Sequence, residues 1–229
     1  AVSFLVRDEN WGTYAATLRN LSIEQDAQHF KISYAATCSR ADQLIDYEAS
    51  IEGRADGSLT FRGKAIPRTD FLTARTGFVV LHPLTGVVGQ ALKVEHVDGT
   101  VTQSEFPQQV NPDCPFRDVR ALSHQVFPGV WARCEMQGDA FEMEDHRNWT
   151  DASFKTYVRP LARPWPYVLP AGVVVEQSVK LAISGQLPKA QTSSASRSIE
   201  LTVGLASQTL VPPIGIGMPA EEVDAALAK

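Results

Sequence analysis

Ionisable side chains are concentrated in one short segment of this sequence, residues 142–155. Those fourteen residues hold four carboxylates and one each of His, Arg, Lys, Asn and Trp. Close packing of carboxylates raises the pKa of one of them, which is how proteins make general acids and bases. Planar polar groups beside an aromatic ring suit sugars, which present hydroxyl edges and C–H faces. The segment is therefore a candidate site for a sugar or a sugar acid.

The first part of this segment has the alternation of a β-strand. In residues 141–146 every second side chain faces the same way, and Phe141 indicates which face is buried. The three side chains that project from the opposite face are Glu142, Glu144 and His146. Two Glu on one strand face are more often simply the solvated side of an antiparallel sheet, so both interpretations stay open.

The second part of the segment mixes hydrogen-bond donors and acceptors with aromatic rings and leaves the strand pattern. Arg147, Asn148, Asp151 and Lys155 can form a hydrogen-bonding ring, and Trp149 supplies a flat apolar face. The opposing interpretation is a structural brace, in which the Trp lies in the core and Arg–Asp pairs hold a long loop. Burying so many polar groups costs several kcal/mol unless each is paired, which favours a partly buried pocket.

Three residues outside the segment are further candidates for substrate binding: Arg75, His82 and His124. An unperturbed His titrates near neutral pH and can carry a proton. We expect the polar groups around Glu144 to converge on one concave surface, with one of these His nearby. Adjacent residues on a strand point to opposite faces, so the neighbouring carboxylates and His of this segment cannot all face one metal ion. The chain also has no HExxH, P-loop, GxGxxG or GxSxG motif. We therefore expect neither a metal nor a cofactor.

The hydrophobic pattern has mostly period two, which predicts an all-β domain with two large antiparallel sheets packed face to face. Hairpin turns are expected at Asp56-Gly57 and Asp98-Gly99, and a third at residues 137–139. Later strands are expected at residues 172–184 and 197–205. Weak helix signals occur only in "FLTAR" near Phe71 and in the tail.

Composition limits the function further. The net charge is -5 and no run of Lys and Arg occurs, which disfavours nucleic acid and anionic membranes. No apolar run approaches the ~18 residues of a membrane span. The three Cys form no CxxC pair, which favours a reducing, cytoplasmic location. We expect one β-sandwich domain over residues 1–217 and the start of a linker or helix to a missing domain over 218–229.

Four stretches resemble the N-terminal domain of D-apionate lactonases. They are "FLVRDENWGTY", "RTGFVVLHPLTGVVG", "FPQQVNPDCPFRDVRALSH" and "EMEDHRNWTDASFKTY". The resemblance implies a β-sandwich that precedes a TIM-barrel domain and a small C-terminal domain, in an enzyme that opens a sugar lactone to its acid. "RTGFVVLHP" also resembles, more faintly, a strand of galactose-mutarotase-like supersandwich proteins. The barrel that the resemblance implies is missing from this sequence.

Lactone hydrolysis needs a base that activates water and a donor for the developing oxyanion. Under this interpretation Glu142 or Glu144 is the base, assisted by His146, and Arg147 or Lys155 stabilises the oxyanion. The side chains expected to orient the sugar ring are Asn148, Trp149 and Asp151.

Two other functions remain open at this point. The domain is a non-catalytic sugar-binding or interdomain scaffold if the chemistry belongs to the absent barrel, whose active site lies where another domain can contribute residues. An aldose-epimerase-like enzyme is the third possibility, because of the supersandwich likeness. Lactone turnover would support the lactonase, sugar binding without turnover would support the scaffold, and anomer exchange of a free sugar would support the epimerase.

Overall fold

In the computed structural model, the structure describes residues 1–186, and these residues form strands with one short 3-10 helix, η1 (His146–Trp149). The strands in chain order are β1 (Val2–Val6), β2 (Thr17–Gln25), β3 (His29–Arg40), β4 (Gln43–Arg54), β5 (Leu59–Pro67), β6 (Phe71–Thr73), β7 (Thr76–Pro83), β8 (Ala91–His96), β9 (Val101–Glu105), β10 (Phe116–Phe127), β11 (Val130–Gln137), β12 (Phe141–Asp145), β13 (Ser153–Val158), β14 (Tyr167–Leu169) and β15 (Val175–Ser184).

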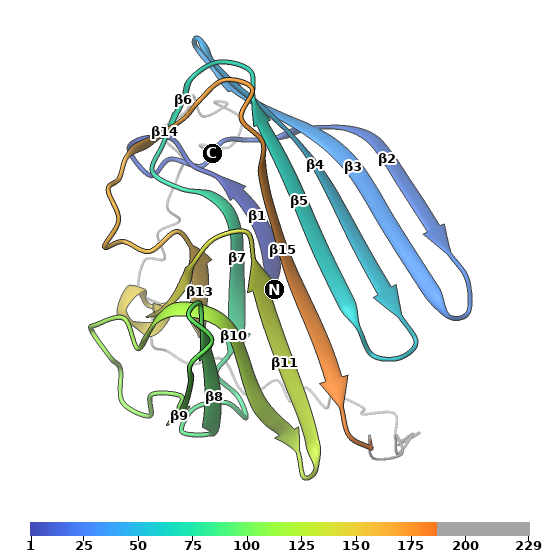
Figure 1. The fold of residues 1–229 in the computed structure, drawn as a ribbon, viewed down its shortest axis with the longest axis vertical. Helices are drawn as coiled ribbons and strands as arrows, with labels where there is room; N and C mark the ends of the chain where they lie inside the picture. Colours follow the sequence, from blue (N-terminus) through green and yellow to red (C-terminus); the bar gives the residue numbers. More distant parts are fainter. Residues whose placement is uncertain (187–229) are drawn as a thin grey trace, which may run out of the picture. The chain divides into compact units, whose positions relative to one another are not determined.

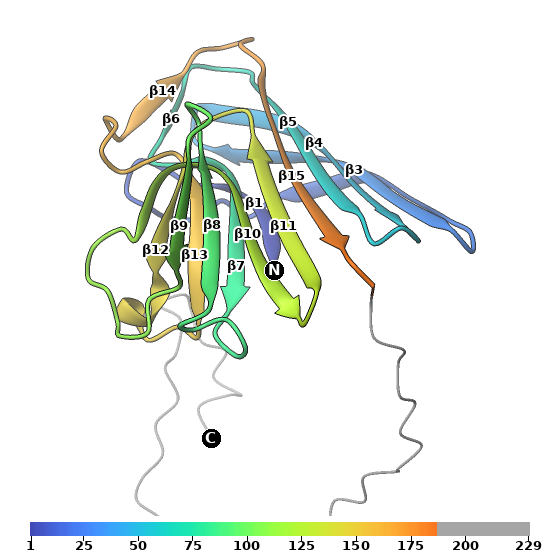
Figure 2. The ribbon, with the colours of Figure 1, turned by 60° about the horizontal axis from the view of Figure 1, so that its bottom comes forward.

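Thirteen of these strands form one hydrogen-bonded antiparallel sheet, and β6 and β14 form a separate pair. The order of the main path is β1-β7-β13-β12-β10-β11-β15-β5-β4-β3-β2, and β8 joins β9 to β10. Figure 1 shows β2 to β5 as a fan beside β15 and β11. Figure 2 shows β7 and β13 as one group and β3 to β5 as another, with β11 and β15 between them.

The two ends of this path pack face to face, so that the sheet forms two layers. Phe4 in β1 contacts Phe78 in the neighbouring β7, with ring centroids 5.2 Å apart. It also contacts Tyr47 in β4 at 5.0 Å, although β1 and β4 share no hydrogen bonds. Gly63 in β5 leaves room for this packing, because a Cβ there would lie 2.6 Å from the Phe4 ring. The prediction of an all-β antiparallel fold is confirmed. The two packed layers belong to one continuous sheet, however, and not to two separate large sheets as expected.

Two of the three predicted hairpins are confirmed. The turn at Asp56-Gly57 joins β4 to β5, and the turn at Asp98-Gly99 joins β8 to β9. In each turn the Asp side chain accepts a hydrogen bond from a backbone N–H two residues later, and the Gly has a φ of +84°. Asp-Gly is favoured in such turns because Gly adopts positive φ without steric cost.

The third hairpin prediction, at residues 137–139, is wrong. β11 and β12 do not pair with each other; both pair with β10, along the edge opposite to β8. Gly138 (φ +100°) lies at the bend between them, and a Cβ there would lie 2.1 Å from the backbone oxygen of Glu176. The glycine therefore allows a strand to change direction beside β15, which a local turn signal cannot distinguish from a hairpin.

The helix prediction near Phe71 is also wrong. That segment contains β6, which pairs with β14, and Phe71 is fully buried. Five residues are too few for a stable helix, so tertiary packing decides the outcome. The expected strand at 197–205, the helical tail and the linker at 218–229 lie outside the described residues. The domain boundary at 217 stays a prediction.

Three further observations concern the cysteines, the membrane and metal ions. Cys38, Cys114 and Cys134 are all free. Within residues 1–186 no helix is long and apolar enough to cross a membrane. In the same residues no group of three or more His, Cys, Asp or Glu is placed to hold a metal ion.

Candidate functional site

The dense polar segment folds as an antiparallel hairpin, in which β12 passes through η1 into β13. Glu142 lies opposite Tyr157, and Glu144 opposite Lys155. Asp145 caps η1 by accepting a hydrogen bond from the backbone N–H of Arg147. The strand pattern therefore ends at residue 145, and the expected departure from it is confirmed for residues 146–152. It is wrong for residues 153–158, which form the strand β13.

Side chains of this hairpin alternate as predicted, but both faces of its first half are covered. Phe141 and Met143 are fully buried on the core face, as expected. Glu142, on the other face, is only 1% exposed, so the solvated alternative is wrong for this residue. Its Oε1 accepts hydrogen bonds from the Tyr157 hydroxyl at 2.7 Å and from the Leu161 N–H at 2.6 Å. The chain after β13 thus covers Glu142.

Glu144, by contrast, is partly exposed and lies at the centre of a second set of contacts. Lys155 Nζ lies 2.7 Å from its Oε2, and the indole N–H of Trp149 donates to its Oε1. The Trp149 side chain is 68% exposed, which leaves one ring face open to solvent or to a partner. These three residues unite a carboxylate, a cation and an aromatic surface, the combination that the sequence predicted.

His146 joins this set through Lys155. The Lys155 amine donates to His146 Nε2 at 3.3 Å, while His146 Nδ1 lies 3.0 Å from Asp151 and 3.2 Å from Ser153. This pattern assigns the hydrogen of the neutral imidazole to Nδ1. Burial lowers the pKa of His146, and the charge of Lys155 lowers it further. The carboxylates of Glu144 and Asp151 raise the pKa, but by less. A neutral imidazole near pH 7 can accept a proton.

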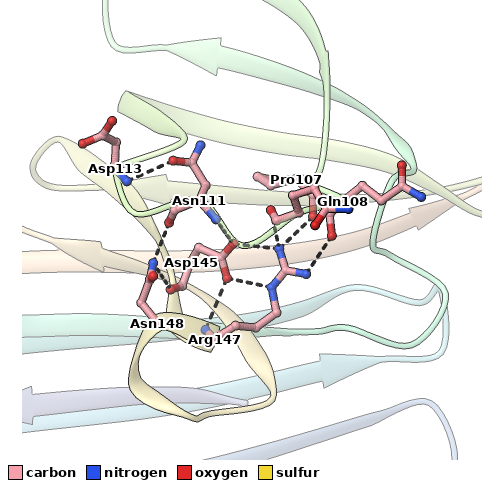
Figure 3. A network of polar contacts seen from close by, with 8 residues as sticks. Pro107, Gln108, Asn111, Asp113, Asp145, Arg147 and Asn148 are labelled. Carbon is pink, nitrogen blue, oxygen red and sulfur yellow. Dashed lines mark hydrogen bonds and ion pairs between the residues drawn. The ribbon is translucent and has the colours of Figure 1, made fainter.

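We call Glu144, His146, Trp149, Asp151 and Lys155 the open cluster. Arg147 and Asn148 belong to a different set, although they lie between members of the open cluster in sequence. Figure 3 shows them directed toward the loop that precedes β10.

Arg147 is a brace in the structure. Its guanidinium contacts both carboxylate oxygens of Asp145, at 2.8 and 2.7 Å. It also donates to the backbone oxygens of Pro107, Gln108 and Gln109, at 2.9, 3.1 and 3.0 Å (Figure 3). Because these five acceptors already use the N–H donors of the guanidinium, it could bind an oxyanion only by breaking this network.

Asp145 and Asn148 complete the brace. Asp145 is fully buried, and its second oxygen also accepts from the Asn111 N–H at 2.8 Å. Burial alone would raise the pKa of Asp145, but the hydrogen bonds from Arg147 and Asn111 outweigh it and lower the pKa. The Asn148 amide donates to the backbone oxygens of Asn111 and Asp145. The brace interpretation therefore holds for Arg147 and Asn148, whereas the site interpretation stays a prediction for the open cluster.

Arg75 lies near the open cluster, on the same side of β13. Its guanidinium carbon is 3.7 Å from the ring centroid of Tyr157 and 4.9 Å from that of Trp11. The residue is 6% exposed, and its Nε has no hydrogen-bond partner among the described residues. Burial lowers the pKa of Arg75 despite the negative charges of Glu144 and Glu142. Trp11 was not a candidate from the sequence, although it lies in one of the four stretches that carry the resemblance.

His82 and His124 lie on the opposite face of the sheet from the open cluster. His82 Nε2 is 2.8 Å from the hydroxyl of Thr156, a residue whose neighbours in β13 face the other way. Both His rings lie near the buried Phe106, with centroids at 6.4 and 5.4 Å. Burial lowers the pKa of His82 to about 3, so it is neutral and structural in these surroundings. The expectation that one of them lies beside Glu144 fails on this geometry.

Fold and contacts together define a large antiparallel β domain that carries a partly exposed polar cluster on one hairpin. The chain belongs to the family of the D-apionate lactonase N-terminal domain, which matches residues 1–186.

A curated relative, the D-apionate lactonase of Brucella anthropi, is 45% identical over 230 residues. The alignment covers 100% of this chain, which spans 38% of the relative's length. Among solved structures, galactose 1-epimerase from Lactobacillus acidophilus matches with a TM-score of 0.45 and 8% identity, over 74% of this chain and 66% of that one. The alpha-galactosidase from Lactobacillus brevis matches with a TM-score of 0.48 and 11% identity, over 80% and 29%. Neither structural likeness supports a conclusion about function.

Proposed function

We propose that this chain is the N-terminal β domain of a longer enzyme that hydrolyses a sugar lactone, an aldonolactone such as D-apionolactone, to its acid. Membership of the D-apionate lactonase N-terminal domain family supports the substrate class. The open cluster supports a part for this domain in the reaction, because it places a carboxylate and a neutral imidazole each within hydrogen-bond reach of one amine. That arrangement is the single observation on which the catalytic assignment depends.

In this proposal, Glu144 is the base that removes a proton from the attacking water. His146 relays a proton to the ring oxygen that leaves when the lactone C–O bond breaks, so the product is the open hydroxy acid. Lys155 stabilises the oxyanion that develops on the lactone carbonyl. Trp149 and Asp151 hold the sugar ring, the first through its C–H face and the second through hydroxyl groups. Glu142 is left to a structural role because it is buried and its Oε1 accepts two hydrogen bonds, and Arg147 because its guanidinium is already paired.

The test replaces the three reacting groups in the full-length protein, one at a time, by Glu144→Gln, His146→Gln and Lys155→Met. A general base typically contributes about 10²–10⁴-fold, so kcat/KM for lactone opening should fall by about that factor in Glu144→Gln. Ser3→Ala, on the exposed part of β1, is the matched control and should retain full activity. Turnover that survives all three substitutions would exclude the cluster from the chemistry.

A second function is favoured by the exposure of Trp149. An exposed Trp is the kind of residue that anchors an interface between proteins or domains. The domain would then be a non-catalytic sugar-binding or interdomain scaffold of a TIM-barrel enzyme, with the open cluster closing over the barrel's active site. Binding of a sugar acid by the isolated 229-residue chain without turnover supports this alternative. Accelerated anomer exchange of a free aldose would instead support the epimerase interpretation.

A further inference from the structure

A polar hollow of about 710 Å³ lies on the layer formed by β3, β4, β5 and β15. It is separate in sequence from the open cluster, which belongs to β12, η1 and β13. None of the residues that line it was a candidate from the sequence. Its size falls within the range of small-molecule sites, about 300–1,000 Å³.

The register of the strands explains why this face is hollow. Ser33, Ser50, Arg62 and Ser178 lie opposite one another on four consecutive strands, and Gln137 in β11 continues the row. Serine occupies three of the four central positions, and its short side chain leaves a depression in the middle of this sheet face. A row of this kind crosses the strands with one residue per strand, at intervals of about 4.8 Å.

Longer side chains flank the serine row on both sides. On one side, Glu48, Lys64 and Glu176 lie opposite one another on β4, β5 and β15. On the other side, the row contains Lys31, Glu52, Thr60 and Lys180. Glu48, Lys64 and Glu176 line one side of the hollow, and Lys31 lines the other side. The other members of the second row lie just beyond the lining, and the serine row forms the floor.

The charged side chains in and beside the hollow are of both signs and loosely paired. Lys64 lies 3.5 Å from Glu176, and Arg62 lies 3.7 Å from Glu52, with all four side chains in partial or full contact with solvent. Mixed charge gives no net attraction for a polyanion or a polycation. It does supply donors and acceptors side by side, which neutral hydroxyl groups can use in both directions.

We infer that this hollow binds an extended, neutral oligosaccharide, with the chain of sugar units lying across the strands. A polar group recurs at each strand, at a spacing close to the length of one sugar unit in an extended glycan. Serine hydroxyls and the Arg62 guanidinium contact the hydroxyl edges of successive units, and the flanking rows confine the chain. The inference is independent of the proposed function, because it uses no residue of the open cluster.

The test measures binding of neutral tetrasaccharides (cellotetraose, xylotetraose and laminaritetraose) to the full 229-residue chain by calorimetry. Glucose, xylose and tetragalacturonate serve as the single-unit and anionic probes. At least one tetrasaccharide should bind ten times or more tightly than its monosaccharide, and tetragalacturonate should bind more weakly than that tetrasaccharide. Failure of all three tetrasaccharides, or preferred binding of the anionic probe, overturns the inference.

Substitutions in the floor of the hollow test whether the oligosaccharide binds there. Ser50→Tyr and Ser178→Tyr fill the floor and should abolish binding, whereas Ser50→Ala should weaken it by about tenfold or less, the value of one ordinary hydrogen bond. Ser3→Tyr, on an exposed position of β1, is the matched control and should bind like the parent chain. Because Ser50→Ala keeps the hollow and adds no bulk, it reports on the site even if a Tyr variant fails to fold. Equal binding by the parent chain and both Tyr variants contradicts the assignment.

Discussion

Glu144 and Asp145 are neighbours in β12, yet they belong to opposite kinds of polar structure. Asp145 is fully buried, and Arg147 and two backbone N–H groups satisfy its carboxylate. Glu144 is partly exposed and is held by the flexible Lys155 and by an exposed indole. The first arrangement fixes a loop in place, whereas the second leaves groups that a ligand can reach. Sequence proximity alone therefore says little about which residues share a role.

The strongest test of this contrast is Arg147→Ala against Lys155→Ala. Removing Arg147 leaves the buried Asp145 without its cation, and breaking a buried pair in this way costs about 3–5 kcal/mol. Removing Lys155 breaks a pair whose carboxylate stays in partial contact with water, so the loss should be smaller than for Arg147. Urea unfolding of the two variants measures both values. Similar losses in the two variants would show that the brace and the open cluster do not differ in this respect.

A second comparison uses His82 and His146, which lie near opposite faces of β13. Burial depresses the pKa of His82 to about 3, whereas an unfolded His titrates near 6.5. Between these values the unfolded chain binds the extra proton, so stability is present above pH 6.5 and falls with decreasing pH by roughly 1.4 kcal/mol per unit. Over two pH units the loss is about 2.7 kcal/mol.

His82→Gln should remove this dependence. His146, whose pKa is lowered by burial and by Lys155, should contribute in the same direction but less, because it is partly exposed. Denaturant midpoints measured from pH 7 to pH 4.5 compare the parent chain with His82→Gln and His146→Gln. An unchanged slope in His82→Gln would assign the pH dependence to other groups.

Tyr157→Phe tests the covered half of the β12 face. The hydroxyl of Tyr157 donates to the buried Glu142, and burial together with that carboxylate raises the pKa of Tyr157. Loss of a hydrogen bond to a charged group costs about 1.5–3 kcal/mol, while the packing of the ring against Arg75 is retained. Thermal unfolding should show the corresponding drop. A variant as stable as the parent would mean that Glu142 finds another donor.

Trp149→Ala has the smallest expected effect on the isolated chain. The side chain is 68% exposed, and substitutions at such positions usually change stability by less than about 0.5 kcal/mol. In the full-length protein the same change should weaken substrate binding or domain contact and raise KM. Calorimetry on the isolated chain and kinetics on the full-length protein separate the two effects. A large loss in the isolated chain would place Trp149 among the structural residues.

Local patterns in the sequence predicted the local features of the fold. Phe141 and Met143 alternate with polar residues and are buried, and the turns at Asp56-Gly57 and Asp98-Gly99 form as expected. The direction of Arg147 was not predictable in this way. Its backbone acceptors lie about forty residues earlier, and nothing in their sequence marks a carbonyl as an acceptor.

Long-range pairing explains the remaining errors. Gly138 lies between polar residues, as a glycine in a hairpin turn does. Only the pairing with β10 determines that β12 extends along the same edge as β11 and does not fold back onto it. The serine row became visible only through register, since Ser33, Ser50 and Ser178 are far apart in the chain. Period-two patterning gives the face of a side chain but not its neighbour across the strands.

β15 has a consequence for the synthesis of this protein. It pairs with β11 on one side and β5 on the other, and Gln177 within it bonds to the backbone of Phe78 and Thr76, about a hundred residues earlier. In the topology of residues 1–186, the edges of β5 and β11 thus stay unpaired until residues 175–184 have left the ribosome. Unpaired edges attract other chains, and long-range pairing is slow to form. The nascent chain is therefore most prone to aggregate just before its fifteenth strand emerges, and a ribosome that pauses there would prolong the danger.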